Sequence, residues 1–184
     1  MSSFATRFAM LDTLVSSKTK IKLLLKFFLN ANNTSYLRNL ETEFGESTNA
    51  IRLELNRFEE SGLLNSYNER NKKIFKANTK HPLYPEINSI VRKYIGIDKI
   101  IESIVTKLGE PDRVWLVGEL AKGLNNEVIE LNIVGNVNKE YLDSLIKKVE
   151  KVINKKLKVR LLNVEEENAF KSNNEPCLLL WSKA

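Results

Sequence analysis

Histidine and cysteine are almost absent from this sequence, and their scarcity excludes several kinds of site. His81 is the one histidine and Cys177 the one cysteine among 184 residues. A zinc site built from several such ligands is therefore excluded, and so is an internal disulfide. His81 precedes Pro82 and is predicted to lie in a loop, whereas Cys177 lies in an apolar run that predicts a buried, inert thiol.

Long apolar runs are also missing. The most apolar stretch, residues 21–29, contains two lysines and falls far short of the roughly 20 residues that a membrane span needs. The first ten residues, MSSFATRFAM, lack the charged start and apolar core of a signal peptide. With 42% hydrophobic and 28% charged residues, the composition is typical of a folded chain. We therefore expect a cytoplasmic protein of one or two small domains, with no membrane partner.

The net charge of +6 is unevenly distributed. Residues 1–95 carry 15 Lys or Arg and 9 Asp or Glu, whereas residues 96–184 carry 14 of each kind. The whole excess therefore lies in the first half. A basic half and a neutral half suggest two modules, of which the first meets a polyanion.

Apolar spacing predicts three helices in the first half, each with a capping residue at its start. The first begins at Ser16 or Ser17, the second at Thr34 or Ser35, and the third at Ser47. The inward positions are Ile21, Leu24, Leu25 and Phe28 in the first helix, Leu37, Leu40 and Phe44 in the second, and Ile51, Leu55 and Phe58 in the third. Because Gly45 supplies a tight turn between the last two helices, the order is that of a helix-turn-helix.

The apolar period changes after Gly62, which ends the third helix. Residues 63–67 and 72–77 are predicted strands, and the polar residues 68–71 form the turn between them. A hairpin directly after the third helix is the wing of a winged helix. The third helix is then expected to enter the major groove of DNA, while the basic hairpin holds phosphates.

This geometry predicts which side chains contact DNA. Outward residues of the third helix reach base edges, since Asn pairs with adenine and Arg with guanine. The predicted base-reading residues are Thr48, Asn49, Arg52 and Asn56. The predicted phosphate-binding residues are Lys18, Lys20, Arg57, Arg70, Lys72 and Lys73. The alternative for each single charge is an ordinary solvated side chain.

A helix rich in apolar residues is predicted from about residue 85 to residue 108, after a rigid break at residues 81–85 that contains two prolines. Gly96 interrupts this helix and marks a bend. The apolar positions are Ile87, Ile90, Val91, Tyr94, Ile97, Ile100, Ile101, Ile104, Val105 and Leu108. So long a stripe predicts a homodimer, which would read two half-sites; the alternative is that the stripe packs within its own chain.

The remaining residues predict a small α/β domain. Strands are expected over 113–117, 128–134, 157–164 and 178–181, with helices over 138–154 and 165–171. Residues 118–123 are predicted to form a turn or short helix after the first strand. Gly135 and Asn136 are predicted to form a turn after the second strand.

The run TSYLRNLETEFGESTNAIRLELNRFEESGLLNSYNERNKKIFKANTKHPLYPEI resembles the ArsR-like winged helix-turn-helix regulators of bacteria and archaea. Residues 54–64 resemble the end of their recognition helix, and residues 68–87 resemble the wing and its connection to a nucleotidyltransferase-like domain. The resemblance implies a bacterial, DNA-binding transcription regulator. Metal sensing is not implied, because the sensing members use cysteine and histidine clusters that this chain lacks.

The second half resembles the minimal nucleotidyltransferase domain with its chemistry removed. That family places a glycine–serine turn after its first strand and two acids on its second, because the turn cradles phosphates and the acids hold Mg²⁺. Gly118, Ala121 and Gly123 keep the small residues of the turn. Glu119 stands at the serine, Val128 at the first acid and Glu130 at the second. The resemblance therefore implies remnants of a nucleotide site, with no catalytic residue, metal or cofactor.

Taken together, these patterns predict an α+β protein with a winged helix-turn-helix over 1–82, a connecting and dimerisation helix over 83–108, and a degenerate nucleotidyltransferase-like α/β domain over 109–184. The predicted function is sequence-specific binding of double-stranded DNA in transcription regulation, with the second domain serving dimerisation or the sensing of a signal whose chemistry stays open. The alternatives are an Mg²⁺-dependent nucleotidyltransferase using Glu119 and Glu130, with Glu127 as a further acid, and a module that binds protein rather than DNA.

Overall fold

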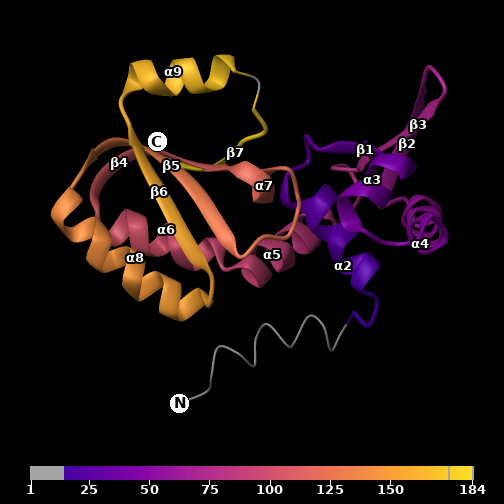
Figure 1. Ribbon diagram of the computed structural model, residues 1–184, viewed down its shortest axis with the longest axis horizontal. Coiled ribbons are helices and arrows are strands. Elements are labelled where there is room, and N and C mark those ends of the chain that lie inside the picture. Colours follow the sequence, from indigo (N-terminus) through magenta and orange to yellow (C-terminus); the bar gives the residue numbers. More distant parts are fainter. Residues whose placement is uncertain (1–14, 174, 184) are drawn as a thin grey trace. The chain divides into compact units, whose positions relative to one another are not determined.

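The computed structural model describes residues 15–173 and 175–183, except for the side chain of residue 110. The segment MSSFATRFAM lies outside these residues. The described chain is a mixed α and β structure with two separate sheets (Figure 1). It divides into two compact units, here termed the N-terminal unit (residues 15–91) and the C-terminal unit (residues 92–183).

The N-terminal unit contains helices and a small antiparallel sheet of order β1-β3-β2. Its elements in chain order are α2 (Lys18–Leu24), the π-helical turn η1 (Leu25–Leu29), β1 (Thr34–Tyr36), α3 (Leu37–Phe44), α4 (Thr48–Glu60), β2 (Leu64–Glu69) and β3 (Lys72–Ala77). β2 and β3 form a hairpin whose two-residue turn, Arg70–Asn71, places Arg70 at a φ of 53°. The order is therefore helix, strand, two helices and hairpin.

The predicted helix starts are right at two positions and wrong at one. Ser17 caps α2 by accepting from the backbone N–H of Lys20, and Ser47 caps α4 by accepting from that of Ala50. The prediction that Thr34 or Ser35 starts a helix is wrong. Thr34 is paired opposite Lys76 of β3, so residues 34–36 are extended and α3 begins only at Leu37.

The core of the N-terminal unit gathers around η1. The side chains of Phe27 and Phe28 are both fully buried. The Phe28 ring packs edge-on against the Phe58 ring, with 6.4 Å between the ring centres. The inward positions predicted in α4 are all buried, as expected. Leu23 and Phe27 are buried as well, although a regular helical period leaves them out. All five residues of η1 are buried, so this turn is enclosed on every side, and a one-sided helical pattern cannot predict which of its residues belong to the core.

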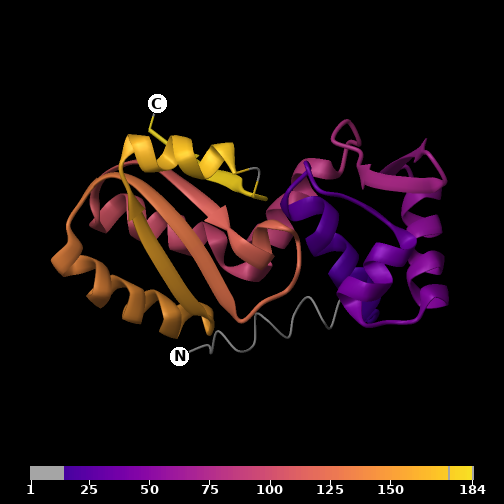
Figure 2. The same ribbon diagram turned by 45° about the horizontal axis from the view of Figure 1, so that its top comes forward.

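The C-terminal unit is built on a four-stranded sheet of order β6-β5-β4-β7. Its elements are α6 (Ile97–Lys107), β4 (Gly109–Val117), α7 (Gly118–Ala121), β5 (Val128–Val137), α8 (Lys139–Ile153), β6 (Lys156–Leu162), α9 (Val164–Ser172) and β7 (Leu178–Ser182). β5 and β6 are parallel, since α8 crosses between them, and the other pairs are antiparallel. Helices α6 and α8 cover one face of the sheet and α9 the other (Figures 1 and 2).

The turn predicted at Gly135 and Asn136 is wrong. Both residues continue β5, where Gly135 lies opposite Pro111 of β4. β4 begins at Gly109, four residues earlier than the apolar pattern indicated, and so gives this part of β5 a partner. An irregularity between Pro111 and Arg113 absorbs the change of register.

The single connecting helix predicted over 85–108 is two helices, α5 (Tyr84–Ile95) and α6, which meet at Gly96. Gly96 has a φ of 89°, and a Cβ there would lie 2.9 Å from Cγ2 of Ile153, so both backbone and packing require glycine. The apolar stripe is partly covered by its own chain, because Val91, Ile97, Ile100, Ile104 and Leu108 are buried. Ile90 is 49% exposed, and Ile87, Tyr94, Ile101 and Val105 are half-buried. The stripe is thus partly covered within the chain, and the homodimer stays a prediction.

The two rare residues lie in irregular segments. His81 lies in a turn, where its Nδ1 accepts from the backbone N–H of Leu83 at 3.1 Å. Cys177 is half-buried, and burial raises the pKa of its thiol, which keeps it protonated and weakly nucleophilic. In the part of the chain that the structure describes, no helix is both long and apolar enough to cross a membrane.

Candidate nucleic-acid interface

Helix α4 presents a polar face because its apolar residues are used inside. Ile51, Leu55 and Phe58 recur at helical spacing and are buried, which fixes the rotation of the helix. The side chains of Asn49, Arg52 and Asn56 are consequently exposed, and Thr48 is half-buried. The predicted base-reading residues therefore share the outer side of one helix.

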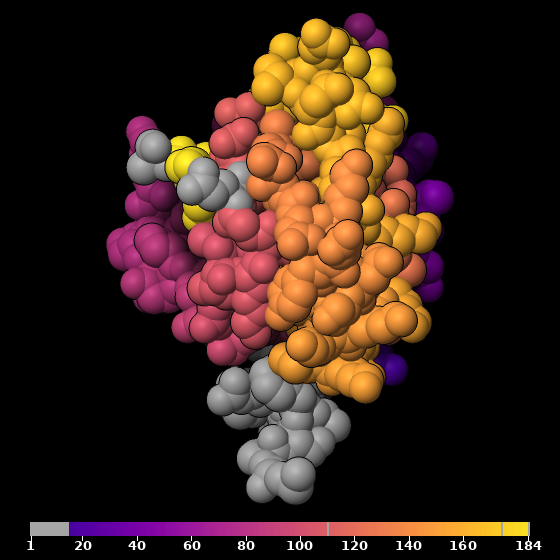
Figure 3. Space-filling view, turned by 90° about the vertical axis from the view of Figure 1, so that its left-hand side faces the viewer, coloured from indigo at the N-terminus to yellow at the C-terminus, as the bar shows by residue number. Residues whose placement is uncertain are grey.

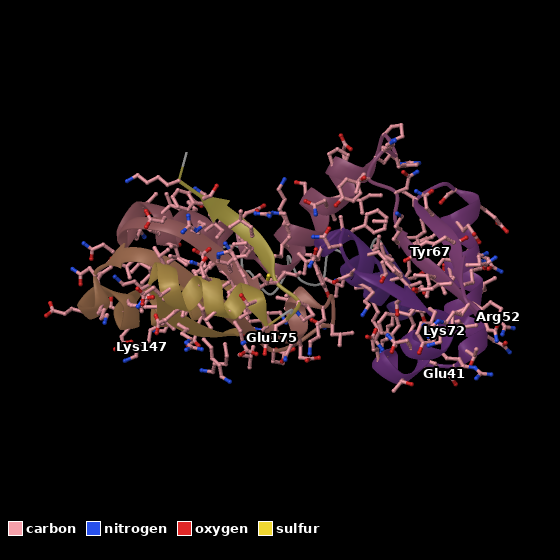
Figure 4. The ribbon with its side chains drawn as sticks, turned by 90° about the horizontal axis from the view of Figure 1, so that it is seen from above. Glu41, Arg52, Tyr67, Lys72, Lys147 and Glu175 are labelled. Carbon is pink, nitrogen blue, oxygen red and sulfur yellow. The ribbon has the colours of Figure 1, made fainter. Side chains whose placement is uncertain are left out.

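The exposed side of α4 borders a groove of about 650 Å³, here termed the α4–hairpin groove. Its lining residues come from α4, from the β2–β3 hairpin and from the start of α3: Tyr36, Leu37, Arg38, Arg52, Leu55, Asn56, Asn71, Lys72, Lys73 and Phe75. Of these described residues, the charged ones are all cations. Figure 4 labels Arg52 and Lys72, which reach the groove from α4 and β3 respectively.

The two lysines of the hairpin are held differently. Lys72 places its Nζ 4.2 Å from the centre of the Tyr36 ring, a contact that leaves its three N–H donors largely available. Lys73 donates to Glu59 of α4 at 2.7 Å. The hydrogen bond from Lys73, with another from Ser66, lowers the pKa of Glu59. Lys73 therefore ties the hairpin to α4, and Lys72 is the better placed of the two to hold a phosphate.

The other predicted phosphate-binding residues do not line this groove. Lys20 and Arg57 both approach the side chain of Glu54, at 3.7 Å and 3.3 Å, so part of their charge is compensated within the protein. Lys18 is exposed at the start of α2, and Arg70 is exposed at the tip of the hairpin. Of the predicted phosphate-binding residues, Lys72 and Lys73 line the groove beside α4. The others lie outside its lining: Lys18, Lys20, Arg57 and Arg70.

The sequence did not predict Tyr36, Arg38 or Asn71 as lining residues of this groove. Asn71 lies in the hairpin turn itself, whereas Tyr36 and Arg38 reach the groove because β1 pairs with β3 and so sets the start of α3 beside the hairpin. That pairing joins residues about 40 positions apart, and periodicity does not report it. Leu53, 52% exposed on α4, is an outward apolar side chain of the kind that contacts the thymine methyl group.

The C-terminal unit contains a second groove of about 750 Å³, between the sheet and α9, here termed the α9 groove. Its lining carries both signs of charge, with Lys158 and Arg160 from β6 and with Glu130, Glu166 and Glu175. Asn132, 7% exposed, lies beside Arg160 in the strand register and also lines the groove. The sequence drew attention to Glu130 alone among these residues.

Helix α9 is anchored over this groove by one buried carboxylate. Glu167, 1% exposed, accepts hydrogen bonds from Arg113 at 2.7 Å and from the Trp115 indole at 2.8 Å, and it pairs with Lys171 at 2.9 Å. Burial by itself raises the pKa of Glu167, but the hydrogen bonds from Arg113, Lys171 and Trp115 outweigh it and lower the pKa to about 2. Glu167 is thus ionised wherever the unit is folded near neutral pH.

The predicted remnants of a nucleotide site are only partly brought together. Gly118 has a φ of 71°, and a Cβ there would lie 2.6 Å from the carboxylate of Glu130, so these two residues are in close contact. The Glu119 carboxylate accepts instead from Lys122 at 2.7 Å. Gly123 is buried in the turn, and Val128 is half-buried at the start of β5. Among the described residues, no three His, Cys, Asp or Glu side chains are placed to hold a metal ion.

Comparison with known proteins adds no relative: no family model, no curated protein and no solved structure matches this chain. The site is therefore interpreted from its own residues: the described charged residues that line the α4–hairpin groove are all cations, whereas the α9 groove carries both signs of charge.

Proposed function

We propose that this protein binds double-stranded DNA in a sequence-specific manner and regulates transcription in the cytoplasm. One observation carries the proposal: the groove beside the polar face of α4 is lined, among the described residues, by four cations and no acid. A phosphate backbone follows such a groove, because each lysine or arginine that approaches a phosphate releases bound counterions.

The order of elements supports a winged helix in the N-terminal unit. α3, the turn at Gly45 and α4 correspond to a helix-turn-helix, with Gly45 in the left-handed conformation that the turn requires. β2 and β3 correspond to the wing, and β1 closes the small sheet against β3. In this arrangement α4 is the recognition helix, and its first turns face the major groove.

The contacts sort the side chains into two roles. Arg52 and Asn56 lie on the groove side of α4 and are assigned to base edges, with Thr48 and Asn49 nearer the start of the helix. Lys72 and Arg70 are assigned to phosphates, and Arg38 joins them because it lines the same groove. Lys18, Lys20, Arg57 and Lys73 are assigned to weaker contacts, the last three because each has an acidic neighbour.

The C-terminal unit is proposed to be a nucleotidyltransferase-like domain that does not catalyse nucleotidyl transfer. The Glu119 carboxylate accepts a hydrogen bond from Lys122. The Glu130 carboxylate lies against Gly118, at the turn where the phosphates of a nucleotide would have to bind. Val128 offers no oxygen to a cation. We assign this unit to dimerisation or to the sensing of a signal.

The assay that tests the proposal measures how duplex affinity depends on salt. Mixed-sequence and genomic duplexes are titrated by fluorescence anisotropy between about 0.05 and 0.3 M salt. For the variant Arg38→Gln/Lys72→Gln, which changes two cations that line the groove, each lost phosphate contact lowers the slope of log K against log salt by about 0.9, so we expect a fall of about 2. Affinity should fall roughly tenfold or more at about 0.1 M salt.

The matched control is Lys80→Gln/Lys93→Gln, which removes the same charge from two exposed lysines that do not line the groove. It should leave the slope nearly unchanged. Equal effects of the two variants would mean that net charge, and not this groove, binds DNA. Absence of duplex binding by the unmodified protein would overturn the proposal.

A further inference from the structure

Residues 96–184 are neutral as a whole, but their charges are separated. Residues 147–160 contain seven Lys or Arg and one acid, Glu150, which gives this segment a net charge of +6. The rest of residues 96–184 contains seven Lys or Arg and thirteen acids. The equal totals for residues 96–184 therefore conceal a strongly basic segment.

Part of this segment forms one surface. The second half of α8 and the start of β6 border a groove of about 550 Å³, whose lining includes Lys147, Lys151, Lys155 and Lys156 together with Glu127 and Glu150. Helix α8 lies on the outer side of the unit, beside α6 (Figure 3). Figure 4 labels Lys147, which projects from α8. These four lysines are termed the α8 lysine cluster.

The members of the cluster differ in how well they are compensated. Lys155, whose side chain is 6% exposed, donates to the carbonyl of Asn126 at 2.6 Å, and Lys156 lies 3.6 Å from Glu150. Lys147 and Lys151 are exposed, and within residues 15–173 and 175–183 neither forms an ion pair. They stand four residues apart on α8, so their charges repel each other. A bound anion would relieve this repulsion.

The surroundings of the cluster favour a phosphate backbone over other anionic partners. The segment has no aromatic residue on which an unpaired base stacks. The inward apolar residues of α8, Leu142, Leu145, Val149 and Ile153, are buried, so the helix has no free apolar face for a bilayer. Among the described residues of the segment, Val152 is the only exposed large apolar side chain, which is too little for the apolar core of a protein interface.

We propose that the α8 lysine cluster is a second, sequence-independent contact with the backbone of double-stranded DNA. The inference rests on the proposed function, because the N-terminal unit is what brings the chain to DNA. Lysines suit this role, since a flexible point charge follows phosphates without reading bases. The cluster adds affinity and salt dependence without adding sequence preference.

The test compares Lys147→Gln/Lys151→Gln with Lys107→Gln/Lys139→Gln in the full chain. All four residues are exposed, both pairs lose the same charge, and Lys139 lies at the opposite end of α8. The probes are mixed-sequence duplexes of about 15 and about 40 base pairs. For the cluster variant we expect the salt slope on the longer duplex to fall by about 2 and affinity at about 0.1 M salt to fall roughly tenfold. The control should change affinity less than twofold.

The outcomes separate this inference from the proposed function. If the cluster variant behaves like its control while Arg38→Gln/Lys72→Gln still weakens binding, the cluster contact is refuted and the groove assignment stands. If the cluster variant alone weakens binding, the groove assignment fails. Vesicles containing phosphatidylserine are a third probe: binding to them that depends on Lys147 and Lys151, without loss of duplex affinity, would assign the cluster to a membrane surface and overturn the inference.

Discussion

The α4–hairpin groove and the α9 groove are similar in volume, about 650 and 750 Å³, but differ in charge. The first places Arg38, Arg52 and Lys72 around a helix face that carries amide side chains. The second mixes Lys158 and Arg160 with three carboxylates. The proposed DNA contact belongs to the first groove, because no described lining residue there is negatively charged, whereas the carboxylates of the second would repel a phosphate backbone.

The grooves also differ in what holds their walls. The hairpin wall is tied to α4 through the partly exposed Glu59, which pairs with Lys73 and accepts a hydrogen bond from Ser66. The α9 wall depends on Glu167, which is buried and engages three side chains. Partly exposed pairs contribute little to stability, and breaking a buried one is costly. The two walls should therefore respond very differently to the loss of one carboxylate.

The largest effect is expected from Glu167→Gln. The folded-state pKa of about 2 is below the ordinary value of 4.5, so the ionised carboxylate stabilises the fold above about pH 5 and this contribution disappears as the pH falls towards 2. The difference corresponds to about 3 kcal/mol. We expect the variant to lose about that much stability at pH 7 and to show a flatter stability profile between pH 5 and 2.

Urea unfolding followed by tryptophan fluorescence measures the stability of the C-terminal unit, because both tryptophans, Trp115 and Trp181, lie there. Glu165→Gln is the control, since Glu165 is exposed in the first turn of the same helix. Duplex affinity should change less than twofold in the folded variant. A loss of stability as large in Glu165→Gln would contradict the anchoring role of Glu167.

The second effect concerns sequence preference and tests the other groove. Arg52→Ala removes an exposed guanidinium that lines the α4–hairpin groove. A bidentate contact with guanine is worth about 1–3 kcal/mol of discrimination, so we expect the preference at one base position to weaken roughly tenfold. Selection from a random duplex library, followed by sequencing, measures this preference.

Arg57→Ala is the matched control, because Arg57 is exposed on the same helix but pairs with Glu54 and does not line the groove. Overall affinity should fall in both variants, while the base preference should change in Arg52→Ala alone. An unchanged preference in Arg52→Ala would remove this residue from base reading.

The features that could be predicted from the sequence are those that depend only on residues close to them in the chain. The cap at Ser47, the buried face of α4 and the strands of the hairpin all follow from neighbouring residues. The structure has the cap and the buried face as predicted, and the strands within two residues of their predicted bounds. The errors come from pairing between distant residues. β1 is extended because it pairs with β3, and Gly135 continues a strand because β4 starts early. Arg38 and Arg160 enter their grooves through the same kind of pairing, which is why neither was predicted.

The smallest expected effect is at Gly118, the point where the α9 groove meets the turn. Gly118→Ala places a residue with a side chain at a φ of 71°, which costs about 1 kcal/mol. The new Cβ would also meet the Glu130 carboxylate at 2.6 Å, and that flexible group must move. Gly45→Ala isolates the first cost, because Gly45 has a φ of 61° and no atom within 4 Å of its added Cβ.

Double-mutant analysis by urea unfolding separates the two costs. In a Glu130→Ala background the contact is gone, so Gly118→Ala should cost about as much as Gly45→Ala does in the N-terminal unit. In the natural background it should cost several tenths of a kcal/mol more, the coupling typical of side chains in contact. A coupling of zero would mean that Glu130 turns away at no cost. The carboxylate would then be free to bind a ligand in the α9 groove. The two grooves would in that case differ only in the charges of their lining residues.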